Sequence, residues 1–246
     1  MSPVLRTTLL YALVPVFFTI IGATAGAYWP AMARLRSYVL HLAAGVVFAV
    51  VAVELLPEIQ RRALVGHVVV GFVLGIGTML AVDRLLDRLR GGDDDDDEDA
   101  PAVGLSLLAA VGIDFLLDGL LLGVGFAAGA RIGVLLALAE AAEQLSVGLA
   151  LAGELTRASM PRGRVLLLVS ALGLLVFGSA VLGATVLSGL TGGAMEIVLS
   201  FGAAALLYLV TEELLREAHE ERETALATAM FFAGFLAFLV VGMVLE

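Results

Sequence analysis

The chain has 246 residues, of which 61% are hydrophobic and 15% charged, and its formal net charge is −10. One soluble core of this length cannot bury so much apolar surface, which excludes a soluble globular protein. The apolar runs are continuous and do not alternate in polarity, which excludes a transmembrane β-barrel. Because the chain has no cysteine, disulfides and thiolate metal sites are excluded, and a bound metal must use oxygen or nitrogen ligands.

Eight apolar runs are long enough to cross a bilayer as helices, which takes roughly 20 residues each. They cover residues 4–28, 35–56, 64–87, 102–127, 131–154, 164–189, 194–216 and 223–245. We therefore predict an all-α polytopic membrane protein with a single transmembrane domain over residues 1–246. The first run lacks a small-residue cleavage site behind a short apolar core, which favours a retained helix over a signal peptide.

Arginine carries all the positive side-chain charge, because the chain has no lysine. Ten arginines lie in or beside the odd-numbered loops, and four lie on the other side: Arg6, Arg61, Arg62 and Arg131. This bias predicts that the odd loops are cytoplasmic and that both termini lie outside. Arginine without lysine and a high content of Ala, Val, Gly and Leu are typical of a GC-rich prokaryote, so we expect a prokaryotic cell membrane.

The longest loop, "RGGDDDDDEDAP" at 90–101, carries seven consecutive acids at 93–99. Such a run repels itself and cannot pack, so we expect a solvated linker. A weak cytoplasmic cation sponge is the alternative. Elsewhere, Gly71 with Gly75 and Gly119 with Gly123 form GxxxG pairs that let two helices approach closely, which indicates a tight bundle.

Carboxylates also lie inside the apolar runs. The fourth run, "GIDFLLDGLLLGVG", carries Asp114 and Asp118, and the fifth, "LALAEAAEQLSVG", carries Glu140, Glu143 and Gln144. Spacings of three and four residues place each set on one helix face. Four charges at the bilayer centre would cost on the order of 10 kcal/mol, so these side chains do not face lipid.

No Lys, Arg or His lies in the central part of any predicted span, which excludes salt bridges to basic residues. Two explanations remain: the acids are neutral and hydrogen-bonded to one another, or a cation neutralises them. A very short turn around Arg131 makes the fourth and fifth helices antiparallel neighbours, so four carboxylates and an amide can form an oxygen-rich divalent site. With no catalytic partner nearby, such a site indicates transport and not an enzyme.

Two further acidic segments resemble each other: ELLPE at 54–58 and ELLRE at 213–217. They lie in predicted helices that cross the membrane in opposite directions, which indicates an inverted repeat of helices one to three and six to eight around a central pair. The alternative is that Glu58 and Glu217 anchor helix ends in the headgroup region.

Taken together, these features resemble the ZIP (Zrt/Irt-like protein) family of divalent metal transporters. The resemblance covers eight spans with outside termini, a charged loop after the third helix, ELLPE, and acids on helices four, five and seven. It implies a 3+2+3 inverted-repeat bundle, an elevator mechanism, a homodimer, and movement of Zn²⁺ toward the cytoplasm, with Mn²⁺ or Fe²⁺ next. It also implies a binuclear centre between helices four and five.

The motifs depart from the family pattern. In the fourth helix, Asp114 stands at the family's histidine, Phe115 at the asparagine, Asp118 at the acid and Gly119 at the glycine. Phe115 cannot coordinate a metal, so a single metal or an altered second site is expected.

In the fifth helix, we favour the register that places Glu140 and Glu143 at the two acids of the motif. Ala139 and Ala142 then replace the histidine and the proline. A slip of one residue would place Glu140 at the histidine and Gln144 at the final acid. The acid of the family's seventh helix corresponds to Glu213, or less well to Glu212.

The predicted metal ligands are therefore Asp114, Asp118, Glu140, Glu143, Gln144 and Glu213. Release is expected toward Glu213, Glu217 and His219. His41 is expected to be structural, with a role as an exit ligand as the alternative, and His67 is expected to be a solvated helix-end residue. Two alternatives stay open: a metal-sensing or non-transporting membrane protein with this fold, and a proton-linked carrier of another solute.

Overall fold

The computed structural model describes residues 3–29, 36–62, 64–90, 105–187, 189–219 and 224–244. The acidic run at 93–99 lies outside these residues. Within them, helices are the only regular secondary structure. In chain order they are α1 (Pro3–Tyr11), α2 (Leu13–Tyr28), α3 (Arg36–Ala49), η2 (Val50–Leu55), α4 (Leu56–Arg62), α5 (Val65–Arg90), α6 (Leu105–Ala128), α7 (Ala130–Arg157), α8 (Arg162–Leu187), α9 (Gly192–Tyr208), η4 (Leu209–Leu214), α10 (Leu215–His219) and α11 (Ala225–Val244).

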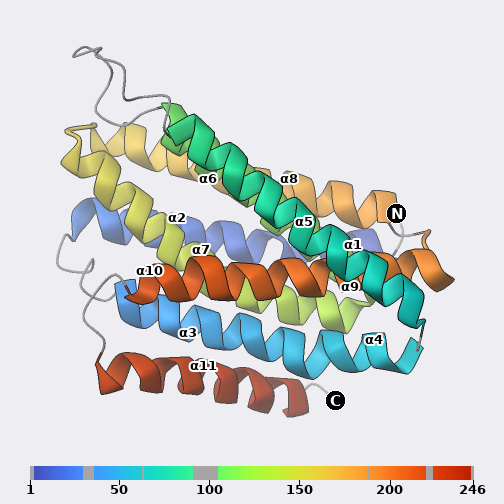
Figure 1. Cartoon of the computed structure of the whole chain (residues 1–246). Helices are drawn as coiled ribbons and strands as arrows, with labels where there is room; N and C mark the ends of the chain where they lie inside the picture. The colour runs from blue at the N-terminus through green and yellow to red at the C-terminus, as the bar shows by residue number, and fades with distance from the viewer. Residues whose placement is uncertain are drawn as a thin grey trace.

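Eight helices among the described residues are long and apolar enough to cross a membrane, as a multi-pass membrane protein requires. They match the eight predicted spans in order, and the second continues to Arg62, past the predicted end at residue 56. The first span is interrupted at Ala12, between α1 and α2. Pro15 explains the interruption, because it has no N–H to donate to the carbonyl of residue 11. Helix α1 begins and α11 ends at the same end of the bundle (Figure 1).

The helices form two packed groups. Helices α1, α2, α6, α7 and α8 contact one another and form what we term the central unit. In the other group, which we term the flanking unit, α3 packs on α11 and α5 packs on α9, and the continuations η2, α4, η4 and α10 complete it. The units meet mainly where α3 contacts α7 and where α6 contacts α9 and α5. We call the two ends of the bundle the odd-loop end and the even-loop end, after the loops found there.

Glycines set the closest helix contacts. A Cβ at Gly71 or Gly75 would collide with the backbone of α9, so this predicted pair does join two helices. Gly119 and Gly123 also form such a contact, but with the backbone of α8 and not with α7. The carboxylates of α6 face α7, so these glycines pack a different side of α6 against α8.

Two wide π-helical turns interrupt the second and seventh spans. The segment η2 contains VVAVEL and η4 contains LVTEEL. Glu54 and Glu213 are each the fifth of the six residues, so the repeated ELL sequence has the same position relative to the turn in both spans. Such turns are rare and are frequent at functional sites.

Candidate metal centre

The centre is built on two antiparallel helices joined by one residue. Helix α6 ends at Ala128 and α7 begins at Ala130, with Gly129 between them. This short connection confirms that the two helices are neighbours. Acids at comparable distances from the turn, such as Asp118 and Glu140, therefore lie at the same depth in the bundle.

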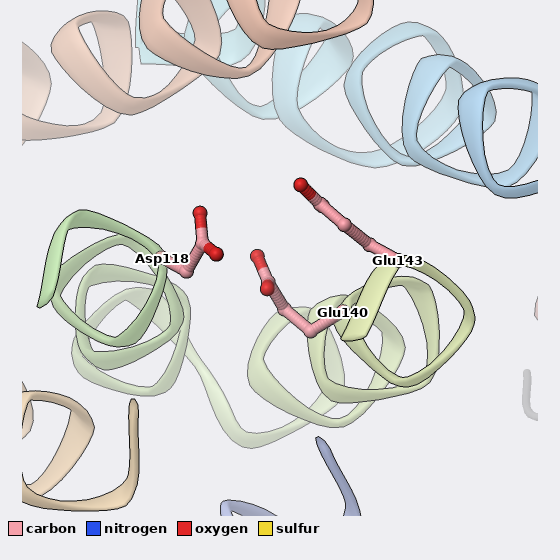
Figure 2. Close-up of side chains that lie close together, drawn as sticks. All are labelled: Asp118, Glu140 and Glu143. Carbon is pink, nitrogen blue, oxygen red and sulfur yellow. The ribbon is translucent and has the colours of Figure 1, made fainter. Parts of the chain in front are cut away.

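Three of the predicted ligands converge. Asp118, Glu140 and Glu143 each offer a carboxylate oxygen, and these three oxygens lie within 4.8 Å of one another. Figure 2 shows Asp118 on α6 facing the two glutamates on α7. The residues are only 1–2% exposed. Oxygens at this spacing can share one ion, because ligand atoms on opposite sides of an ion lie about 4–5 Å apart.

No described residue neutralises Asp118 or Glu140. Asp118 Oδ2 accepts a hydrogen bond from Gln144 Nε2 at 2.9 Å. Glu140 Oε2 is buried and has no hydrogen-bond partner among the described residues. Neither Asp118 nor Glu140 forms an ion pair with any described residue. Buried carboxylates need a countercharge or a proton, so this set of oxygens is suited to a cation.

A cavity of about 170 Å³ leads to the centre. Asp114, Glu143 and Glu213 line it, so Glu143 belongs to both the cavity wall and the carboxylate cluster. Asp114 and Glu213 are half-buried and lie outside the cluster of three. The lining contains five carboxylates and two arginines, Arg36 and Arg216. Its acidic excess concentrates cations.

The chain positions of the lining residues show where the cavity lies. They come from the first part of α3 and α6, the last part of α5 and α7, and from η4 and α10, all of which adjoin odd loops. Toward the even-loop end, most of the residues that follow Asp118 are buried and apolar, including Leu122 and Phe126. The centre is therefore approached from the odd-loop end and covered at the other.

An ion pair lies at the covered end. Arg131 Nη2, at the start of α7, is 3.0 Å from Glu54 Oε1 in η2 and 3.3 Å from the carbonyl oxygen of Gly242 in α11. The predicted acids Glu54 and Glu58 thus have basic partners, since Glu58 pairs with Arg61 and Arg62. Glu54 does not line the cavity, whereas Glu213 at the matching position of η4 does.

Neither His41 nor His67 joins the cluster of three carboxylates. His41 is buried, and its Nδ1 lies 2.7 Å from the Ser37 carbonyl oxygen, as expected for a structural residue. His67 is exposed near the start of α5, as predicted. The side chains of Glu217 and His219 lie outside the described part of the chain, so the predicted release route through them stays a prediction.

The sequence did not predict a role for two buried polar residues within the spans, Thr19 and Glu196. Thr19 of α2 reaches Gln144, with 3.1 Å between its Oγ1 and Gln144 Oε1. Glu196 of α9 is completely buried, 3.8 Å from Arg62. An acid in the run "GGAMEIVLS" was a visible signal for Glu196, but a threonine in an apolar helix carries no such signal.

Neither a protein-family model nor a curated protein sequence matches this chain. The function is therefore argued from the centre itself.

Proposed function

We propose that this protein transports divalent metal cations across a membrane by alternating access. The observation that carries the proposal is the cluster of Asp118, Glu140 and Glu143, buried on two adjacent helices at the inner end of an acidic cavity. Ionisable groups in membrane helices are costly and typically mark ion pathways. A centre that opens toward only one end of the bundle is what one state of an alternating-access carrier requires.

The arrangement of the helices supports an internal repeat. Exchanging the first span with the sixth, the second with the seventh, the third with the eighth and the fourth with the fifth maps the main contacts onto one another. The contact of α2 with α7 then corresponds to that of α8 with α6, and α3 with α11 corresponds to α9 with α5. The matched π-helical turns fit the same exchange. Spans related in this way run in opposite directions, as in transporters built from inverted repeats.

The direction of transport follows from the arginine bias. If the odd loops are cytoplasmic, the cavity faces the cytoplasm and the conformation is inward-open, with Arg131 and Glu54 at the closed outer end. A cation would load from outside in the opposite conformation and leave along Asp114 and Glu213.

The ligand set favours one cation per centre. Phe115 lies three residues before Asp118 on the same side of α6, is completely buried and offers no donor atom. No histidine lines the cavity or joins the cluster among the described residues. Carboxylates with water suit Mn²⁺ and other hard ions, and they also bind Zn²⁺ and Fe²⁺. Membership of the ZIP family would place Zn²⁺ first, whereas the ligands alone favour Mn²⁺.

The test is uptake by the purified full chain in proteoliposomes. Radioactive Zn²⁺ or Mn²⁺ is the tracer, and Zn²⁺, Mn²⁺, Fe²⁺, Co²⁺, Cd²⁺ and Mg²⁺ are the competitors at several pH values. We expect saturable uptake that Asp118→Ala and Glu143→Ala abolish and that Glu212→Gln retains, because Glu212 is exposed and lies outside the cavity lining.

Three outcomes would contradict the proposal. Saturable metal binding without flux would indicate a sensing protein. Proton flux without metal binding would indicate a carrier of another solute. Full uptake by both alanine variants would show that the cation path lies elsewhere.

A further inference from the structure

A chain of side-chain hydrogen bonds connects the metal centre to a third helix. Thr19 on α2 lies 3.1 Å from Gln144 on α7, and Gln144 Nε2 donates to Asp118 Oδ2 on α6 at 2.9 Å. All three residues are buried, with at most 1% exposure. Because water does not reach these side chains, it cannot take over their hydrogen bonds. The orientation of Asp118 therefore depends on Gln144 and Thr19.

The chemistry of the groups fixes the direction of the chain. An ionised carboxylate only accepts hydrogen bonds, so the NH₂ group of Gln144 must face Asp118 and its carbonyl oxygen must face Thr19. The Thr19 hydroxyl is the donor that this oxygen meets. Without a donor there, only the bond to Asp118 would favour this amide orientation over the flipped one.

Close packing holds Thr19 in place. A Cβ at Gly148 of α7 would collide with the Thr19 carbonyl oxygen, and one at Gly22 of α2 would collide with the backbone around Leu145. Gly173 of α8 faces the Thr19 side chain, and a Cβ there would make ordinary van der Waals contact with it at 3.5 Å. The single hydroxyl proton is shared between Gln144 Oε1 and the Pro15 carbonyl oxygen, which lies 2.9 Å from Thr19 Oγ1.

The consequence concerns how Asp118 binds a cation. Its Oδ2 already accepts a hydrogen bond from Gln144, which uses one of the two lone pairs of that oxygen and leaves Oδ1 as the freer ligand. Ca²⁺ takes six to eight oxygen ligands and often binds both oxygens of a carboxylate. Smaller ions such as Mg²⁺ take six ligands at shorter distances. A carboxylate restricted to one oxygen therefore disfavours Ca²⁺ relative to a smaller ion.

We infer that Thr19 and Gln144 form a positioning pair that favours one-oxygen coordination by Asp118 and so makes the centre discriminate against Ca²⁺. Gln144 acts here through Asp118 and is not itself a ligand. The inference rests on the proposed function, because it assumes that the centre binds a divalent cation.

The experiment measures Mn²⁺ binding to the purified full chain by calorimetry, alone and in competition with Ca²⁺. Thr19→Val removes the hydroxyl with little change of shape, Thr19→Ser keeps it, and Gln144→Met removes the amide. Thr24→Val is the matched control, because Thr24 bonds the carbonyl four residues back in the same helix but is exposed. Thermal denaturation of each variant shows whether it is folded.

Loss of a group that orients a ligand typically weakens metal binding roughly 10- to 100-fold. We expect Mn²⁺ binding to weaken by about that factor in Gln144→Met and by about tenfold in Thr19→Val. Ca²⁺ should weaken less, so that its affinity relative to Mn²⁺ rises in both variants. Thr19→Ser and Thr24→Val should match the unaltered protein. A purely structural role would lower stability without changing this ratio.

The outcomes separate the inference from the proposed function. If the unaltered protein binds Mn²⁺, and Thr19→Val binds Mn²⁺ and Ca²⁺ with the same affinities as the unaltered protein, the inference is wrong and the proposed function stands. The same holds if both ions weaken by the same factor. If Thr19→Val does not fold, the ratio in Thr19→Ser and Gln144→Met decides. If the unaltered protein binds no divalent cation, both proposals are wrong.

Discussion

Arg131 and Glu54 join the two units of the bundle at the even-loop end, with 3.0 Å between Arg131 Nη2 and Glu54 Oε1. Arg131 belongs to the central unit, which carries the carboxylates, and Glu54 belongs to the flanking unit. Since the Arg131 side chain is 40% exposed, the pair adds little to stability. Its position between the units makes it a contact that must break if the covered end opens.

Arg131→Glu should open the even-loop end by placing two like charges together. The chain has no cysteine, so Ala139→Cys, at a buried position next to Glu140, supplies a single reporter thiol. We expect several-fold faster labelling by a membrane-impermeant thiol reagent added at the even-loop side. Arg61→Glu is the control, because Arg61 pairs within α4 only. Unchanged labelling in Arg131→Glu would mean that the pair does not hold this end closed.

Glu140→Gln and Asp118→Asn should separate cation binding from stability. Each removes one of the three charged ligands that we propose. We therefore expect the affinity for divalent cations to fall by more than the roughly 100-fold loss that is typical when a residue that orients a ligand is removed. In chelator, each variant should be at least as stable as the unaltered protein, because a buried charge has been removed. Calorimetry and thermal denaturation measure the two effects. A large fall in Tm in both variants would indicate that the carboxylates are structural.

Gly123→Ala should destabilise the packing of α6 on α8. The added Cβ would lie 2.7 Å from both the Ala180 oxygen and the Ala184 nitrogen, which are backbone atoms and cannot rotate away. We expect a loss of about 1–3 kcal/mol, typical of overpacking, seen as a lower Tm in detergent. Gly77→Ala is the matched control, because nothing lies within 4 Å of a Cβ there. Equal Tm values for the two variants would contradict the close contact.

Arg62→Ala should leave Glu196 buried without its basic neighbour. Removing one partner of a buried pair typically costs about 3–5 kcal/mol, and the 3.8 Å separation and partial exposure of Arg62 place the expected loss below that range. Adding Glu196→Gln should restore most of the stability, because the uncompensated charge is then gone. A double-mutant cycle by denaturation measures this coupling. Additive effects would mean that the two side chains are energetically independent.

Local patterns were sufficient to predict the spans and the main cluster. Eight apolar runs predicted the eight candidate spans. The short turn expected around Arg131, with the spacing of Glu140 and Glu143, predicted a shared face toward Asp118. Spacing alone did not separate the cluster from its surroundings. Asp114 lies four residues before Asp118 and therefore on the same face of α6. It nevertheless lies in the cavity wall, because one turn of the helix moves it toward the odd-loop end.

Other features depend on contacts that sequence spacing does not define. The partner of Gly119 and Gly123 is α8, and only the packed bundle shows it. Gln144 was predicted as a ligand, but its amide orientation depends on Thr19, which is 125 residues away in the chain. The π-helical turns also have no pattern in the sequence beyond the repeated ELL.

The single residue between α6 and α7 limits how a bound cation can be released. One residue spans at most about 3.6 Å, so the helix ends that meet at Gly129 cannot separate appreciably. The contact between α6 and α7 also favours their movement as a pair. Under the proposed function, a cation between Asp118 and Glu140 would then be carried along with its ligands. Its departure would depend on water and the carboxylates of the cavity wall competing for the ion once that side is exposed.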